Sequence, residues 1–232
     1  MKKAFYFVIS IHILIGCKKT TDSFKLEGTY KSDKIENVYP VIMFTKQGQV
    51  TDLAAIKKFL QFRGTSDGFV FDSSSIPVFD NLLTLTIDEH NKVSMLKDSS
   101  TIPVAGEIID QTSAQIVIAG NDSAEGAVPS YYSSRCDTLD ITSVIPPKTY
   151  YILPIGSNSF SKFRPMFPVK IENQRLILPL IRYVVSCYNG TTKYCYKYIF
   201  EEWNTFNSSI VGQLQTGDTI VYQAKEVALL KQ

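Results

Sequence analysis

Short apolar runs that end at turn residues recur from residue 26 to the C-terminus of this 232-residue chain, and from residue 82 onward apolar and polar residues alternate in them. In residues 82–87, leucine and isoleucine alternate with threonine, and the turn 88–91 separates this run from a second one at 93–96. A period of two bounded by turns is typical of antiparallel strands. The other runs are 26–30, 41–44, 107–110, 115–119, 169–172, 175–178, 180–188, 193–201, 210–215, 219–223 and 227–230. We therefore predict an all-β fold, a mainly antiparallel barrel or sandwich.

One segment breaks this pattern and favours a helix. Residues 52–63 place Ile56 and Leu60 on one face, Thr51 precedes them as a candidate N-cap, and Gly64 can end the helix. We predict one short helix here that covers one end of the β-structure.

Composition supports a folded domain and excludes some partners. The chain has 24 basic and 22 acidic side chains, 44% apolar residues and 12% aromatic residues, unlike disordered chains. Removing residues 1–16 would take away Lys2 and Lys3 and no acid, leaving a neutral chain. A neutral surface gives no electrostatic basis for binding nucleic acid. We predict one β domain over residues 26–232.

The first residues have the layout of an export signal. Lys2 and Lys3 precede an apolar run that is too short to span a membrane and ends at Gly16 and Cys17. The stretch 14–17, Leu-Ile-Gly-Cys, resembles the lipobox of bacterial lipoproteins. That resemblance implies a signal peptide over 1–16, lipidation of Cys17 and a tether over 17–25. In such lipoproteins an aspartate directly after the lipidated cysteine retains the protein in the inner membrane. Here Lys18 stands at that position, so the resemblance implies anchoring in the outer membrane of a Gram-negative cell.

A second, shorter resemblance concerns the start of the folded part. Gly28 and Tyr30, followed by a strand that ends in Phe-Thr-Lys-Gln-Gly at 44–48, look like the entry into the barrel of lipocalin-like bacterial lipoproteins. The resemblance covers residues 26–48 and implies a barrel. The chain departs from that family directly afterwards, because the predicted helix follows instead of another hairpin.

Residues 120–148 are rich in glycine, proline and serine and predict a long irregular loop, either a crossover between two parts of the β-structure or a lid.

Three triplets also resemble the Asp-Ser/Thr-aliphatic sites at which some Gram-negative envelope proteins are O-glycosylated. Their candidate acceptors are Ser123, Thr138 and Thr219.

The sequence offers little for catalysis. After removal of the signal, His90 is the one remaining histidine, and it lies in a predicted turn, so neither a Ser-His-Asp site nor a Cys-His metal cluster is expected. Glu201 and Glu202 are the nearest suggestion of an acid pair, but adjacent strand residues point to opposite faces. We predict no catalytic residue, metal or cofactor, with an acid-dependent hydrolase as the enzymatic alternative.

The hairpin 180–201 places Cys187 directly opposite Cys195 if its loop is Gly-Thr-Thr at 190–192. Opposed residues in a non-hydrogen-bonded pair are close enough for a disulfide, which an oxidising compartment favours. We predict this bond. A bridge from Cys136 to either cysteine is the alternative, and each choice leaves one thiol over.

The same register places Tyr188, Tyr194, Tyr196 and Tyr198 on one face of the hairpin. An exposed tyrosine face could stack against sugars or contact a protein partner. Because tyrosine is also common at half-buried strand positions, we expect this face to be one wall of the β-structure.

These observations predict a non-enzymatic binding or structural module of the cell envelope, held at the membrane by its lipid anchor. The alternatives are a lipocalin-like carrier of a small apolar ligand and a surface carbohydrate-binding or adhesion module. Expected partners are therefore a carbohydrate, an apolar ligand or an envelope protein, but not nucleic acid.

Overall fold

The structure is a computed structural model. It describes residues 24–66, 68–72, 83–97, 104–121, 123–127, 136, 139–145, 148–152, 159–188 and 194–232, with the backbone alone at 33–36, 97, 123–127, 148–152, 159–163 and 194. The predicted signal peptide, Cys17 and Thr138 lie outside these residues.

Strands make up most of the described chain, which confirms the all-β prediction. The strands are β1 (Gly28–Val38), β2 (Ile42–Thr45), β3 (Gly48–Val50), β4 (Leu83–Ile87), β5 (Lys92–Lys97), β6 (Val104–Gln111), β7 (Gln115–Gly120), β8 (Ser123–Ala127), β9 (Lys148–Ile152), β10 (Ser159–Phe163), β11 (Met166–Glu172), β12 (Arg175–Tyr188), β13 (Tyr194–Trp203) and β14 (Thr219–Lys231). The helices are α1 (Leu53–Phe62) and the 3₁₀ helix η4 (Ser208–Gln213).

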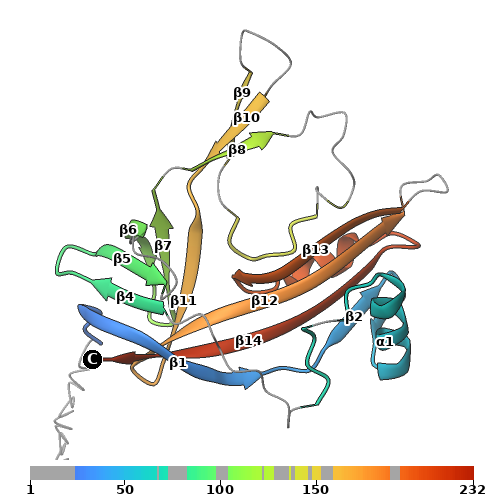
Figure 1. Ribbon diagram of the computed structural model, residues 1–232, viewed down its shortest axis with the longest axis horizontal. Helices are drawn as coiled ribbons and strands as arrows, with labels where there is room; N and C mark the ends of the chain where they lie inside the picture. Colours follow the sequence, from blue (N-terminus) through green and yellow to red (C-terminus); the bar gives the residue numbers. More distant parts are fainter. Residues whose placement is uncertain are drawn as a thin grey trace, which may run out of the picture.

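Eight strands close into an antiparallel barrel. Following the chain, β1, β4, β5, β6, β7, β11, β12 and β14 each pair with the next, and β14 returns to pair with β1 (Figure 1). This up-and-down order needs no crossing connection, so the additional elements are inserted between neighbouring barrel strands. The barrel, rather than the sandwich, is therefore the architecture.

The barrel interior is filled by the protein's own side chains. Tyr30, Leu85, Ile118, Leu178 and Leu229 come from five different strands and are all buried in one apolar cluster. An eight-stranded barrel is just wide enough for side chains to fill it or to hold one small ligand. Here the large aliphatic side chains take up the interior, and their burial is the main source of stability.

Two barrel strands continue far beyond the barrel (Figure 1). Strands β12 and β14 stay paired from Leu176 opposite Leu229 to Ser186 opposite Thr219. Strand β13 pairs with the outer side of β12, while β2 and then β3 extend the sheet beyond β14. We call the sheet formed by 181–188, 194–203, 219–224, β2 and β3 the arm.

Both faces of the arm are covered. Helix α1 buries Ile56 and Leu60 against Val184 and Val221 on one face. Residues 139–145 and η4 cover the other face, where Ile141 and Ile210 belong to a cluster with Ile181 and Val185. The presence of the helix agrees with the prediction, but α1 lies on one face of the arm rather than over an end of the β-structure. Of the helices described, none is long and apolar enough to span a membrane.

The described part of residues 120–148 is less irregular than expected. Strand β8 lies in this segment and joins β10 and β9 in a separate three-stranded sheet (Figure 1). The order β8, β10, β9 lies between barrel strands β7 and β11 in the chain, so the segment is an insertion into the barrel meander. Because β7 and β11 pair directly with each other, the insertion joins two neighbouring barrel strands.

Four local predictions were wrong. Asp52, not Thr51, is the N-cap of α1, because its side chain accepts a hydrogen bond from the Ala54 N–H at 2.9 Å. Residues 175–178 and 180–188 form one strand through Pro179, and 219–223 and 227–230 form one strand through three less apolar residues. Residues 210–215 are largely 3₁₀ helix rather than strand. In the second and third cases the residues at the expected break pair across β12 and β14, with Pro179 opposite Glu226, and the local sequence does not reveal this partner.

Two adjacent leucines test the inward face of the barrel. Leu229 is 1% exposed and Leu230 is 41% exposed on the same strand. Leu229→Ala should therefore lower the free energy of unfolding by about 2 to 5 kcal/mol, and Leu230→Ala by less than about 1 kcal/mol. Urea unfolding followed by circular dichroism measures both, and equal losses would contradict the assigned face.

Candidate binding surface and cysteine cluster

The predicted register of the β12–β13 hairpin is confirmed. Tyr188 pairs with Tyr194, Cys187 with Cys195, Ser186 with Tyr196 and Val184 with Tyr198. The side chains at even positions from 184 to 188 and the tyrosines at 196 and 198 therefore share one face of the arm, which is the face that α1 partly covers.

This face is only in part the buried wall that we expected, because Val184 and Ser186 are buried whereas two of its tyrosines are exposed. Tyr188 and Tyr196 are 37% and 41% exposed, while Tyr198 is half-buried against the cluster beneath α1. Phe62 at the end of α1 is 78% exposed, and Phe200 on β13 is 65% exposed. We call Phe62, Tyr188, Tyr196 and Phe200 the aromatic surface.

Arg63 lies in the middle of the aromatic surface. Its guanidinium carbon is 5.1 Å from the ring centroid of Phe62, 5.7 Å from that of Phe59 and 5.8 Å from that of Tyr196. Its Nη2 donates a hydrogen bond to Ser186 Oγ at 2.5 Å. Cation–π contacts of this kind are favourable, and they fix a cation among aromatic rings from two elements.

The position of Arg63 follows from the end of α1. Arg63 is the C-cap residue, and the next residue, Gly64, has φ +64°. This left-handed conformation is easily adopted by glycine, so the helix ends here and the chain turns away. The helix end thereby places Phe59, Phe62 and Arg63 beside β12.

A cleft of about 340 Å³ opens beside these residues. Its lining comes from the end of α1, from the arm strands and from the turn before β14: Phe59, Phe62, Arg63, Ser186, Gly217 and Thr219. Aromatic rings next to a guanidinium and two hydroxyl groups give the cleft both apolar faces and hydrogen-bonding groups. That mixture is typical of ligand sites.

The turn at one end of the cleft is tightly built. Buried Asp218 accepts hydrogen bonds from the N–H groups of Tyr188 and Gln215, at 3.1 and 2.8 Å. A Cβ atom added to Gly217, which has φ +90°, would lie 2.9 Å from Tyr188 Cβ. Tyr188 therefore packs directly on this turn, and a larger residue at 217 would displace it.

The two glutamates on β13 point to opposite faces, as predicted. Glu201 binds Lys225 at 2.7 Å and lies 3.8 Å from Arg182. On the other side of the strand, burial raises the pKa of Glu202 above its ordinary value, against the opposing effects of Lys197, Asn204 and Tyr183. Each carboxyl group thus has its own structural partners, and the two do not form an acid pair with each other.

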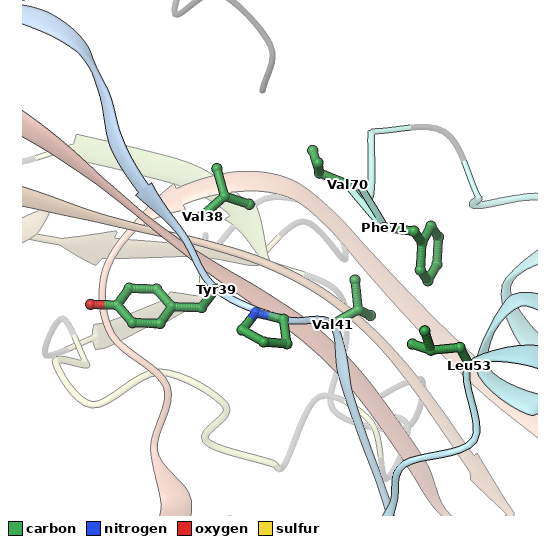
Figure 2. A pocket seen from close by; sticks show the side chains of 7 residues that line it. Val38, Tyr39, Val41, Leu53, Val70 and Phe71 are labelled. Carbon is green, nitrogen blue, oxygen red and sulfur yellow. The ribbon is translucent and has the colours of Figure 1, made fainter. Parts of the chain in front are cut away.

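A second pocket, of about 240 Å³, lies between the end of β1 and the segment after α1 (Figure 2). It is lined mostly by apolar side chains: Val38, Tyr39, Pro40, Val41, Leu53, Val70 and Phe71. Val38 packs against the barrel cluster and Val41 belongs to the cluster beneath α1. The pocket therefore lies where barrel and arm meet, outside the filled barrel interior.

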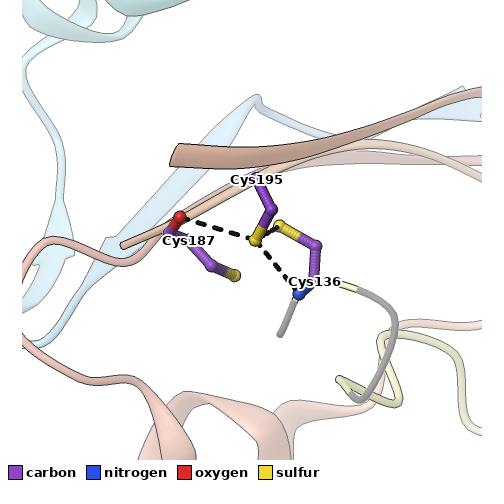
Figure 3. Close-up of side chains that lie close together, drawn as sticks. All are labelled: Cys136, Cys187 and Cys195. Carbon is purple, nitrogen blue, oxygen red and sulfur yellow. Dashed lines mark hydrogen bonds between the residues drawn. The ribbon is translucent and has the colours of Figure 1, made fainter. Parts of the chain in front are cut away.

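The three cysteines of the folded part converge on the opposite face of the arm (Figure 3). The sulfur atoms of Cys136, Cys187 and Cys195 all lie within 4.8 Å of one another, and none of the three is joined in a disulfide. Cys195 Sγ is 2.6 Å from Cys136 Sγ, although Cys187 is its cross-strand neighbour. The predicted Cys187–Cys195 bond is thus not present in the structure, and the convergence of all three thiols was not foreseen.

The other predicted residues are scattered. Thr219 lines the cleft directly after buried Asp218, Ser123 lies on β8, and His90 is exposed in the turn between β4 and β5. These positions bring none of them together as a site. The His90 Nε2 atom lies 3.5 Å from Oε1 of the exposed neighbour Glu89.

Sequence reasoning missed Phe62, Arg63 and Phe200. A weak signal was present for two of them, because Phe62 falls off the apolar face of α1 and Phe200 follows the tyrosines at the same spacing of two. Which strand the helix end would face could not be read from the chain.

Comparisons with known proteins add no relative. No protein-family model matches this chain, and neither a curated protein nor a solved structure matches it.

Two tyrosines separate the aromatic surface from the core. Tyr183 is 3% exposed, so Tyr183→Ala should lower the free energy of unfolding by about 3 to 5 kcal/mol. Tyr196 is 41% exposed, so Tyr196→Ala should lower it by about 1 kcal/mol or less. Thermal and urea unfolding measure both losses. A Tyr196 variant as unstable as the Tyr183 variant would show that Tyr196 is part of the core and would contradict its assignment to the aromatic surface.

Proposed function

We propose that this protein is a lipid-anchored module of the bacterial cell envelope that binds carbohydrate at its aromatic surface. The observation that carries the proposal is the distribution of aromatic side chains. The barrel interior is filled, whereas Phe62, Tyr188, Tyr196 and Phe200 are exposed together on the arm. Monomeric proteins seldom leave such groups together in water without an interaction that uses them.

The chemistry of the surface favours sugars over a purely apolar ligand. Sugar rings have apolar C–H faces that stack on aromatic rings, and hydroxyl groups that need hydrogen-bond partners. Arg63, Ser186 and Thr219 supply such partners at the cleft. Because the cleft contains a guanidinium and no carboxylate among its lining residues, it favours polysaccharides that carry acidic sugars.

Affinity electrophoresis tests this proposal with two defined polysaccharides. Polygalacturonate, which is acidic, should retard the soluble chain from residue 24 onward more than neutral dextran does. Phe62→Ala and Tyr196→Ala should each weaken the retardation about tenfold, which corresponds to the loss of one stacking contact of about 1.4 kcal/mol.

Tyr39→Ala is the matched control. Tyr39 is 43% exposed, like Tyr196, but it lies at the pocket of Figure 2. Its replacement should leave polysaccharide binding unchanged. Unretarded wild-type protein, or equal loss from Tyr39→Ala, would contradict binding at the aromatic surface.

The anchor is a separate part of the proposal and rests on the lipobox at 14–17. Two or three acyl chains on Cys17 would hold the protein at the membrane almost permanently. Cells fed a clickable fatty acid should label the wild type and not Cys17→Ala. A wild type that stays unlabelled in a cell with an active lipoprotein pathway would contradict lipidation.

A small apolar ligand is the second candidate function. The protein's own side chains occupy the barrel interior, where a lipocalin-like carrier would hold its ligand. The pocket of Figure 2, by contrast, is mostly apolar and lies at the base of the arm. Tryptophan at position 41 would fill this pocket, because Val41 lines it. Binding of a fluorescent fatty acid to the wild type, and loss of that binding in Val41→Trp, would favour this role. Retention of polysaccharide binding in the same variant would keep the two sites distinct.

A further inference from the structure

The three cysteine sulfurs are brought together by two separate parts of the fold. Cys187 and Cys195 oppose each other on β12 and β13, and Cys136 approaches them from the segment that precedes residues 139–145. The Cys136 N–H donates a hydrogen bond to Cys195 Sγ at 3.2 Å, and the two sulfurs are 2.6 Å apart. Figure 3 shows the side chains of Cys136 and Cys195 directed at each other, with Cys187 beside them.

The surroundings of the sulfurs favour an uncharged product. Cys136 and Cys187 are fully buried, and the cluster around them contains Leu139, Ile141 and Leu214. A hydrogen bond with Cys187, together with burial, raises the pKa of the Cys136 thiol, and this outweighs the opposing effect of Cys195. Three thiolates around a divalent cation would place a net negative charge among these side chains, which is costly. A disulfide with one remaining thiol carries no charge.

We infer that Cys136 and Cys195 form a disulfide, and that Cys187 is the reserve thiol that pairs with Cys195 when Cys136 is absent. The bond joins positions 59 apart in the chain, whereas Cys187 and Cys195 are 8 apart. Formation of the bond in the living organism rests on the proposed function, because export would bring the protein into an oxidising compartment. The choice of partner does not, because it follows from the arrangement of the three sulfurs.

Exposure decides how the bond forms. Cys195 is the one partly exposed cysteine of the three, so an external disulfide can reach its sulfur first. The Cys195 thiolate attacks the external disulfide and forms a mixed disulfide, and one external thiol leaves. The Cys136 thiol then loses its proton as its sulfur attacks Cys195 Sγ, and the second external thiol leaves with that proton. Overall, two protein thiols are oxidised, and one external disulfide is reduced to two thiols.

The bond would fix an edge of the arm. Strand β13 pairs with β12 alone among the described strands, so its outer side has no strand partner. A covalent link from Cys195 to Cys136 would tie this edge strand to the segment that covers the face opposite α1. The neighbouring residue, Tyr196, belongs to the aromatic surface on the other side of the same strand.

Peptide mapping under non-reducing conditions tests the pairing directly. Purified protein from residue 24 onward is unfolded, reduced, refolded with oxidised and reduced glutathione, alkylated and digested. We expect a Cys136–Cys195 link in the wild type and in Cys187→Ser. In Cys136→Ser we expect a Cys187–Cys195 link, and Cys195→Ser should contain no link between the remaining two.

Three outcomes would overturn the inference. The first is a Cys187–Cys195 link as the main product in the wild type. The second is three free thiols after oxidation in a protein with a folded circular dichroism spectrum. The third is stoichiometric zinc or copper, measured by elemental analysis, in protein whose thiols stay protected from oxidation. Because Cys187→Ser keeps both inferred partners, it tests the bond even if Cys136→Ser fails to fold.

Thermal unfolding with and without a reducing phosphine adds an independent measurement. Reduction should lower the melting temperature of the wild type and Cys187→Ser more than that of Cys136→Ser, because closing the longer loop removes more disorder from the unfolded chain. Equal shifts in all three proteins would contradict the long-range bond. Polysaccharide binding is not needed for either measurement, so the failure of one proposal leaves the other standing.

Discussion

The continuous pairing of β12 with β14 is the interaction on which the rest of the structure depends. One end of this strand pair, from Leu176 opposite Leu229, closes the barrel. The other end, as far as Ser186 opposite Thr219, leaves the barrel and becomes the centre of the arm. The same two strands therefore carry the barrel core, the contact with α1 and the site of the cysteine cluster.

The two ends of this strand pair bury their side chains differently. In the barrel, the face that carries Leu178 and Val227 points to the interior. In the arm, α1 covers one face and residues 139–145 with η4 cover the other, so β12 is buried there at every position from Ile181 to Cys187. A strand that is buried on both faces reads as a nearly continuous apolar run, because no side faces water.

Buried polar residues join the barrel to the arm. Gln223 on β14 binds the segment after α1 through both atoms of its amide: Nε2 donates to Val70 O at 2.7 Å, and Oε1 accepts from the Val70 N–H at 2.9 Å. Glu226 forms an ion pair with Lys170 and accepts a hydrogen bond from Tyr39 Oη at 2.8 Å, and this bond raises the pKa of Tyr39 to about 12. Such groups are stable in the interior because each has a partner.

The local pattern of the sequence determined the fold class, the helix near 52–63 and the cross-strand register of Cys187 with Cys195, because each depends on residues close together in the chain. Tertiary structure decided what that pattern could not. Residues 224–226 looked like a break in a strand because two of them are charged, but Lys225 and Glu226 form ion pairs with residues of other strands and stay in β14. Tyr196 is exposed because β13 is an edge strand that α1 covers only in part, and Cys136 meets Cys195 because the fold brings together positions 59 apart. Exposure and long-range contacts depend on which elements pack against a residue, and one chain's local pattern does not specify those neighbours.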